Sequence, residues 1–307
     1  MRSFLFITCT IFLFIASFPC QAAPVTELIL DRAFFIDGPE NSQPSGLTIK
    51  EGTLFTVSDK HDSTIFKLRL SADKAVMEPY LTFTAPRINE HSYTARHDFE
   101  GLTCDSQGNF YLVSESRFRI LRVSADGTDA SWVTPNLKSN GIASGLFKKA
   151  NAYFEGITLI RPGLFLLCAE RQPRGFMTVD ISNSVPRVDA WQSNQTLFEF
   201  KKGIHPDFSG LWADNKRLFV LERNAYLVCR MAERSGRWEE QEGWSYRHIV
   251  TRPEYRYADT KYGKAEGLCM DKKSVHIILD NNNGSRESAP DDSRPLLLIC
   301  PRPDLNL

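Results

Sequence analysis

The sequence predicts an all-β fold, a β-propeller, on three observations. A short motif, Ser or Glu followed by Gly and then Leu or Ile, recurs in five copies at a nearly fixed spacing. Each copy is followed by the same order of turn and strand-like runs, and helical periodicity is weak throughout. Short strands separated by turn residues at a fixed period are typical of radially repeated sheets. The motif glycines lie 54 to 57 residues apart, at Gly46, Gly101, Gly156, Gly210 and Gly267.

The second copy shows the order of elements within one repeat. Its motif at 100–102 is followed by a turn at 105–109, an apolar run at 110–113 and a further strand-like run at 120–123. The runs contain aromatic and β-branched residues, which favour strands. Each copy therefore predicts one blade. The corresponding apolar runs of the other copies lie at 54–57, 164–167, 218–221 and 275–279.

The two ends of the repeat array predict how the ring closes. The last copy supplies only three strand-like runs, the final one at 296–300, whereas the segment at 27–36 precedes the first copy and is itself strand-like. We expect this N-terminal strand to complete the last blade and close the ring, because closure removes the unpaired strand edges that promote aggregation. Five blades are the preferred arrangement, and six blades, one of them degenerate, are the alternative.

The first 22 residues have the features of a signal peptide. Arg2 supplies a positive charge, an apolar run occupies residues 4–18, and small residues follow. We expect cleavage after Ala22, which leaves residues 23–307 as a single propeller domain in the periplasm or outside the cell. A retained anchor helix and a lipoprotein lipidated at Cys20 are the alternatives. No later run is long and apolar enough to predict stable membrane insertion of the mature chain.

The composition argues against several classes of function. The 37 Lys and Arg residues balance the 37 Asp and Glu residues, so a general attraction to nucleic acid is not expected. The cysteines that remain after the predicted cleavage are odd in number and lack CxxC spacing, which argues against a thiolate metal site. We interpret them as small buried apolar residues, with one disulfide as the alternative. They are Cys104, Cys168, Cys229, Cys269 and Cys300.

Several of these motifs resemble those of a known family. The chain reads Asp-Phe-Glu-Gly-Leu at 98–102 before Tyr-Leu-Val-Ser-Glu at 111–115, and Ala-Glu-Gly-Leu at 265–268 before Leu-Asp-Asn-Asn at 279–282. These segments resemble the phytase-like family, also labelled "esterase-like activity of phytase", and the resemblance extends over about residues 40–300. The alternation of Ser-Gly and Glu-Gly is also similar to the SdiA-regulated propeller family. The resemblance implies a secreted or periplasmic propeller and calcium binding, but no particular activity, since fold alone does not determine function.

Repeated acidic residues predict a site on the propeller axis, where equivalent positions of all blades converge. Three copies carry the acid in the motif itself, and Ser45 and Ser209 replace it in the other two; the three are Glu100, Glu155 and Glu266. A second set lies 12 to 14 residues after the motif glycine, at Asp59, Glu115, Glu170, Glu222 and Asp280. Carboxylates crowded in this way repel one another. We predict that these eight residues hold Ca²⁺, which takes 6–8 oxygen ligands. The alternatives are protonated carboxyl groups or pairing with nearby bases.

The same channel contains residues suited to ester hydrolysis. Three arginines follow acids of the second set by one or two residues and are predicted to bind a phosphate or carboxylate ester: Arg117, Arg171 and Arg223. A carboxylate would act as a general base on water. The predicted catalytic residues are Glu155, Glu100 and His97. Interblade salt bridges are the alternative role for the charged residues, and surface loop positions are the alternative for His97 and His205.

Two functions therefore follow from the sequence. The first is a Ca²⁺-dependent hydrolase of esters or phosphoesters that acts in the central channel. The second is a non-enzymatic exported module in which the acids hold a structural Ca²⁺ and the loops bind a ligand or partner. No GxSxG, HExxH or P-loop motif is present to decide between them. In either case we expect a monomer that takes a small-molecule or phosphoester ligand and does not bind nucleic acid.

Overall fold

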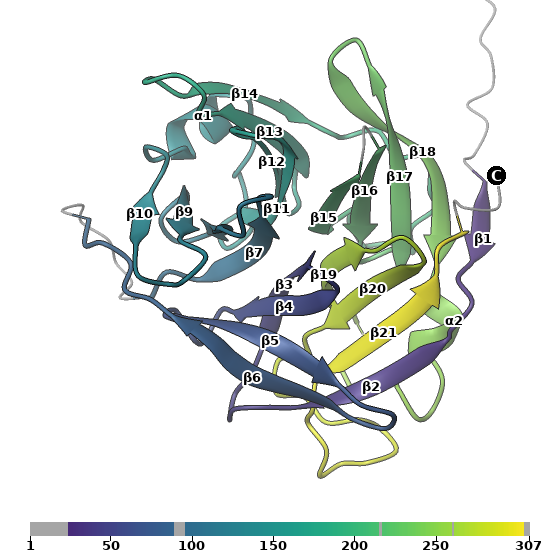
Figure 1. The fold of residues 1–307 in the computed structure, drawn as a ribbon. Coiled ribbons are helices and arrows are strands. Elements are labelled where there is room, and N and C mark those ends of the chain that lie inside the picture. Colours follow the sequence, from purple (N-terminus) through teal and green to yellow (C-terminus); the bar gives the residue numbers. More distant parts are fainter. Residues whose placement is uncertain (1–23, 89–95, 215–216, 260, 304–307) are drawn as a thin grey trace, which may run out of the picture.

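The computed structural model describes residues 24–88, 96–214, 217–259 and 261–303. Most of the strands belong to groups of four antiparallel strands, here called blades 1 to 5, which are arranged around a common centre (Figure 1). The first and the last of these groups are joined in one eight-stranded sheet. The segment 1–22, predicted to be a signal peptide, lies outside the described residues. Among the described residues no helix is long and apolar enough to cross a membrane.

Blades 1 to 4 follow chain order from an inner to an outer strand. Blade 1 contains β3 (Pro44–Lys50), β4 (Thr53–Ser58), β5 (Thr64–Leu70) and β6 (Ala75–Thr82). Blade 2 contains β7 (Phe99–Cys104), β8 (Phe110–Ser114), β9 (Arg119–Val123) and β10 (Ala130–Trp132). Blade 3 contains β11 (Phe154–Arg161), β12 (Leu164–Ala169), β13 (Gly175–Asp180) and β14 (Arg187–Gln192).

The last two blades also receive strands from the N-terminus. Blade 4 contains β15 (Phe208–Asp214), β16 (Arg217–Glu222), β17 (Leu227–Arg234) and β18 (Arg237–Ser245), with β1 (Val25–Glu27) added at its edge. Blade 5 contains β19 (Ala265–Met270), β20 (Ser274–Leu279), β21 (Leu296–Pro301) and, as its outer strand, β2 (Arg32–Asp37). Two short helices lie in the connections, α1 (Lys138–Ala143) and α2 (Arg247–Val250).

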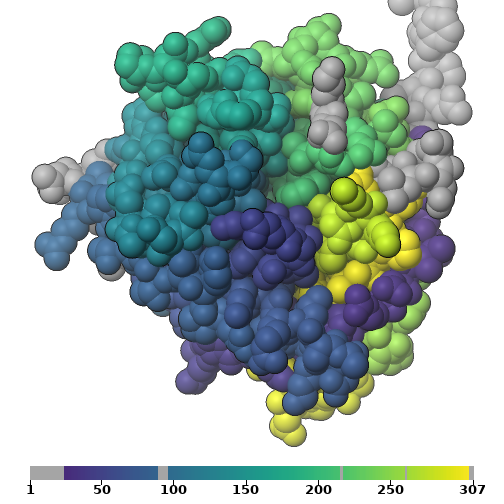
Figure 2. Space-filling model, viewed as in Figure 1, coloured from purple at the N-terminus to yellow at the C-terminus, as the bar shows by residue number. Residues whose placement is uncertain are grey.

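The N-terminal strands link three blades. Strand β2 pairs antiparallel with β21, and its last two residues pair in parallel with β6 of blade 1. Strand β1 pairs in parallel with β18, and Leu28 between β1 and β2 is 1% exposed in the core between blades 4 and 5. The purple N-terminal segment therefore lies beside the yellow C-terminal strands (Figures 1 and 2).

The motif glycines are needed because the inner strands approach one another closely around the axis. A Cβ on Gly46 would lie 2.4 Å from the backbone nitrogen of Leu102 in the next repeat, and a Cβ on Gly267 would lie 2.6 Å from the carbonyl oxygen of Ser45. The last repeat thus packs against the first, so the inner strands form a closed ring. The remaining motif glycines meet the next repeat in the same way, at Gly101, Gly156 and Gly210.

The core is divided among the five seams between neighbouring blades. Each seam holds its own cluster of buried apolar side chains, contributed by the two blades on either side. Phe99, Phe154 and Phe208, which begin inner strands, are all at most 1% exposed in these clusters. The five cysteines of the described chain are free thiols, four buried and Cys104 half-buried, as expected for small apolar residues. The prediction of an all-β propeller is confirmed.

Candidate functional site

A β-bulge at each motif turns the side chain of the residue before the glycine toward the axis. Pairing between inner and second strands slips between Phe99 and Gly101, between Phe154 and Gly156, and between Ala265 and Gly267. The residue inside each slip has no direct partner across the ladder, and a bulge of this kind redirects a side chain. Glu100, Glu155 and Glu266 therefore line one cavity on the axis.

In the other two repeats a serine occupies the bulge and links neighbouring blades instead. The hydroxyl of Ser45 donates to the carbonyl oxygen of Phe99 at 2.6 Å, and that of Ser209 donates to the carbonyl oxygen of Ala265 at 2.7 Å. Both acceptors come immediately before a motif glutamate. The serines thus position the strands that carry Glu100 and Glu266.

The cavity is a blind cup, which we call the channel cup. It has a volume of about 590 Å³, and at the level of the motif glycines the axis leaves a space of only about 10 Å³. The narrow space at the motif glycines holds about one water molecule. A larger ligand can therefore reach the cup only from the opposite end of the axis, where loop residues line the cup. Acids outnumber Lys and Arg among the lining residues. The acids are Asp59, Asp98, Glu100, Glu115, Glu155, Glu170, Asp207, Glu266 and Asp280.

Strand register gives Arg223 a position that an acid occupies in the other blades. Phe99 pairs with Ser114, so Glu115 is the next residue beyond the second strand of blade 2. In blade 4 Phe208 pairs with Glu222, and the next residue is Arg223. Sequence spacing predicts that Glu222 lines the channel. This prediction is wrong, because Arg223 and not Glu222 is among the lining residues. The equivalent residues in the remaining blades are Asp59, Glu170 and Asp280.

Glu222 points into the seam between blades 3 and 4. It forms a buried ion pair with Arg174 and accepts the backbone N–H of Asp207 at 2.7 Å. Arg174 also donates to Glu240 at 2.6 Å, and all three of the paired side chains are at most 2% exposed. Burial raises the pKa of Glu222 to about 8. Glu222 therefore joins two blades and does not line the channel cup.

Arg223 neutralises one side of the cup. Its Nε donates to Asp207 Oδ2 at 3.0 Å, and its two NH groups pair with Glu266 and Glu170. A fourth carboxylate, that of Glu155, lies 3.6 Å away. Arg171 also pairs with Glu170 and lies 3.6 Å from Asp207. Because two guanidinium groups face these four carboxylates, negative charge remains in excess.

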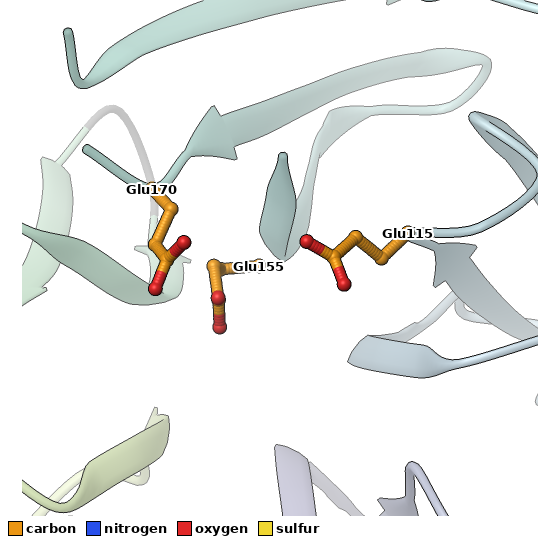
Figure 3. Close-up of side chains that lie close together, drawn as sticks. All are labelled: Glu115, Glu155 and Glu170. Carbon is orange, nitrogen blue, oxygen red and sulfur yellow. The ribbon is translucent and has the colours of Figure 1, made fainter. Parts of the chain in front are cut away.

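Three carboxylates come close enough to share a cation. Glu115, Glu155 and Glu170 each offer an oxygen atom, and these oxygens lie within 4.8 Å of one another (Figure 3). Glu115 Oε1 accepts the backbone N–H of Tyr153 at 3.1 Å, which orients that side chain. Glu170 Oε2 is buried and has no hydrogen-bond donor among the described residues. An orphan carboxylate oxygen beside two others suits a hard cation, which takes oxygen ligands.

Burial and mutual repulsion raise the pKa of most acids in the cup. Burial, together with neighbouring carboxylates, raises the pKa of Glu100 well above its usual range. Burial likewise raises the pKa of Glu155 well above its usual range, although Arg223 opposes the shift. Burial raises the pKa of Glu115 and of Glu266 to about 7, and that of Asp280 to about 6. In the absence of a cation, protons therefore relieve the crowding.

The comparisons with known proteins identify the family. The profile of the family Phytase-like, described as "Esterase-like activity of phytase", matches residues 42–283. The chain belongs to the Phytase-like family. A search of curated proteins found no match for this family member.

Solved structures of known proteins are also similar to this Phytase-like chain. A glutaminyl cyclase from Myxococcus xanthus is 13% identical with a TM-score of 0.53, and the alignment covers 92% of this chain and 99% of that chain. The PQQ-bound aldose sugar dehydrogenase of Streptomyces coelicolor is 11% identical with a TM-score of 0.48, covering 92% of this chain and all of the other. At such low identity the likeness concerns the fold alone.

The structure brings together most, but not all, of the predicted site residues of the Phytase-like chain. Arg171 and Arg223 line the cup with the predicted acids other than Glu222. Arg117 and His97 are not among the lining residues. Arg117 Nε donates to His97 Nδ1 at 3.4 Å, and the imidazole packs against Phe99 and Trp132. The exposed side chain of His205, in contrast, does line the cup.

Sequence reasoning missed a third repeated position in the cup. Asp98 and Asp207 line it, and each lies two residues before the bulge residue of its repeat. Gln43 and Lys264 occupy the same position in their repeats and also line the cup. All four residues lie at the same distance in sequence from the motif glycine, which could have predicted this position. They were missed because the four side chains differ in charge, two being acids, one an amide and one a lysine.

Proposed function

We propose that the channel cup binds Ca²⁺ through Glu115, Glu155 and Glu170 and hydrolyses an ester or phosphoester there. The observation that carries the proposal is the close set of three carboxylates with an unpartnered buried oxygen on Glu170. The Phytase-like family and the enclosed, acid-lined cup support it. The remaining acids, Glu100, Glu266, Asp59 and Asp280, line the same cavity and add negative charge around the cation.

The cation and the residues of the cup have separate roles in the proposed hydrolysis. When bound, the cation supplies positive charge that polarises an ester oxygen and favours ionisation of nearby carboxyl groups. Arg171 pairs with Glu170, and its side chain is 29% exposed in the lining of the cup, so its remaining N–H groups can orient an incoming anionic group. Glu100 accepts a proton from water as the water oxygen attacks the carbonyl carbon or phosphorus, and returns that proton to the departing alkoxide. The acid product thus gains the hydroxyl group of water, and the departing alkoxide gains its proton.

Calorimetric titration of the purified protein with Ca²⁺ tests the cation site. We expect Glu170→Gln and Glu155→Gln to weaken binding on the order of 100-fold, since even residues that only support metal ligands contribute 10–100-fold. Glu239→Gln is the matched control, because this side chain is 58% exposed on blade 4. Equal Ca²⁺ affinity in all four proteins, or no binding by the wild type, would overturn the cation site.

A panel of ester and phosphoester substrates tests the chemistry separately. We expect turnover that requires Ca²⁺ and falls by a factor of about 100 or more in Glu100→Gln, within the usual range for removal of a general base. Ca²⁺ binding without any turnover would favour the second candidate, a non-enzymatic binding module. The specific observation in its favour is that Arg223 already pairs with several carboxylates, as in a structural network.

We also propose that the protein is exported. The signal-peptide features of residues 1–22 support this proposal. N-terminal sequencing of the protein from its native host would give a start at Ala23 if cleavage follows Ala22. A chain that retains Met1 would contradict it.

A further inference from the structure

A second cavity opens beside the channel cup and has a different chemical character. Its volume is about 220 Å³, and most of its lining residues belong to the connection between β18 and β19. We call it the tyrosine pocket, because four tyrosines line it: Tyr226, Tyr246, Tyr257 and Tyr262. Tyr262 and Lys264 line both the tyrosine pocket and the channel cup, so the two cavities are neighbours.

The charged residues of the tyrosine pocket all carry positive charge. They are Lys201, Arg247, Arg256 and Lys264, and no Asp or Glu is among the lining residues that the structure describes. This lining is opposite in sign to that of the adjoining cup. A cavity lined by one sign of charge concentrates ligands of the other sign.

These cations are weakly neutralised by the rest of the protein. Arg256 pairs with Glu287 at 3.3 Å, but both side chains are more than 40% exposed. Lys264 lies 3.7 Å from Asp259, whose side chain is 72% exposed. Lys201 has no ion-pair partner in the described part of the chain. The exposed pair of Arg256 contributes little, so the positive charge of Arg256 and Lys201 remains available to a ligand. Lys264 is less available, because its side chain is 14% exposed and its charge also attracts the Asp280 carboxylate of the channel cup.

Aromatic faces and a buried hydroxyl complete the pocket. The guanidinium of Arg247 lies 4.5 Å from the centre of the Tyr226 ring, and both residues line the pocket. Tyr246 is fully buried, and its hydroxyl has no hydrogen-bond partner among the described residues. Buried polar groups are normally paired, and an unpaired one is destabilising. The Tyr246 hydroxyl is therefore a donor without an acceptor in the part of the chain that the structure describes.

We propose that the tyrosine pocket binds the oxyanion of a small organic ligand, a phosphate or a carboxylate group, with the apolar part of the ligand against the tyrosine rings. The oxyanion accepts from the Tyr246 hydroxyl and from the surrounding Lys and Arg side chains. This inference goes beyond the proposed function, because it requires no cation in the channel cup. It also assigns the ligand a place immediately beside that cup.

The test is calorimetric titration with phenylphosphonate in the presence of EDTA. Phenylphosphonate carries the anion and an aromatic ring but cannot be hydrolysed as an ester. Benzoate replaces phosphonate by carboxylate, and benzyl alcohol keeps the ring without the charge. We expect one of the two anions to bind with 1:1 stoichiometry and benzyl alcohol to bind at least about tenfold more weakly, because hydrogen bonds to charged groups are the stronger ones. The preferred anion identifies which group the pocket takes.

Tyr246→Phe is the decisive variant, since it removes only the orphan hydroxyl. We expect anion affinity to fall about tenfold while thermal stability is unchanged or higher, because no hydrogen bond within the described chain is lost. Lys201→Gln should also weaken binding. Lys202→Gln is its matched control, because Lys202 is an exposed neighbour that does not line the pocket.

Two outcomes would overturn the inference. In the first, neither anion binds better than benzyl alcohol. In the second, Tyr246→Phe and Lys201→Gln bind the anion as the wild type does. Glu170→Gln separates this inference from the proposed function, because it should weaken Ca²⁺ binding on the order of 100-fold yet keep phenylphosphonate binding. If it alone alters anion binding, the anion lies in the channel cup and the tyrosine pocket is not the site.

Discussion

Arg223 Nε donates to Asp207 Oδ2 across 3.0 Å, inside a cup where both side chains are at most 11% exposed. Asp207 comes just before the inner strand of blade 4, and Arg223 comes just after the second strand of the same blade. The pair joins the two ends of one hairpin at the axis. It also places a fixed positive charge where the other blades carry acids, so it sets how much negative charge remains for a cation.

Replacement of Arg223 should make the protein depend on a cation. In Arg223→Gln the carboxylate of Glu266 loses its ion-pair partner, and Glu170 and Asp207 keep only Arg171. Breaking a buried ion pair costs about 3–5 kcal/mol. We expect a lower melting temperature in EDTA and a larger rise on addition of Ca²⁺ than in the wild type, measured by calorimetry. Arg234→Gln, at a side chain that is 72% exposed, is the control. Wild-type stability of Arg223→Gln in EDTA would contradict this prediction.

The stability of the cation-free protein should fall as pH rises. The folded-state pKa is about 7 for Glu115 and Glu266 and about 6 for Asp280, above the values near 4 of an unfolded chain. A raised folded-state pKa stabilises the fold while the group is protonated, and that contribution is lost as pH passes the folded value. Urea unfolding in EDTA from pH 5 to pH 8.5 measures this loss.

Calcium should reduce that pH dependence. A cation replaces the protons on the carboxylates, so its affinity should rise over the same pH range, with protons released on binding. Titrations in two buffers of different ionisation enthalpy count those protons. Stability that increases from pH 6 to pH 8 in EDTA would show that the acids of the cup are already ionised and paired.

The buried group formed by Arg174, Glu222 and Glu240 should contribute to stability and not to cation binding. Arg174→Met leaves two buried carboxylates without their common partner, which should cost about 3–5 kcal/mol in chemical denaturation. Neutralising those carboxylates as well, in Arg174→Met/Glu222→Gln/Glu240→Gln, should recover part of the loss. Ca²⁺ affinity should stay the same in every case. An altered Ca²⁺ affinity of Glu222→Gln would contradict this prediction and show that Glu222 contributes to the cation site.

The ring of motif glycines should tolerate no side chain. In Gly267→Ala the new Cβ would lie 2.6 Å from the Ser45 carbonyl oxygen, so the two inner strands must separate. We expect a loss of about 3 kcal/mol, the upper end for overpacking. Gly203→Ala is the comparison, because nothing lies within 4 Å of its Cβ and only its positive φ opposes the substitution, at about 1–2 kcal/mol. Equal losses in the two variants would refute close packing at the axis.

Repeat spacing alone was enough to predict the architecture and part of the site. The period of the Gly motif predicted the radial sheets, and the strand-like segment at 27–36 contains most of the strand that pairs with β21. Glu100, Glu155 and Glu266 could be placed on the axis because equivalent positions of repeated sheets converge. These inferences depend on local pattern, which the chain carries in its own order of residues.

Tertiary structure decided which side chains share the cup. Glu222 and Arg223 are adjacent in sequence, and the pairing of Phe208 with Glu222 sends one into the blade seam and the other to the axis. A shift of one residue reverses the direction of a strand side chain, and spacing along the chain does not resolve such a shift. The tyrosine pocket could not be predicted from the repeats, because Lys201, Tyr226 and Tyr246 lie outside the repeated motif. The amino-acid pattern by itself determined the repeated sheets and their common axis. Strand register and loop packing, which depend on contacts between distant segments, determined the chemistry at that axis.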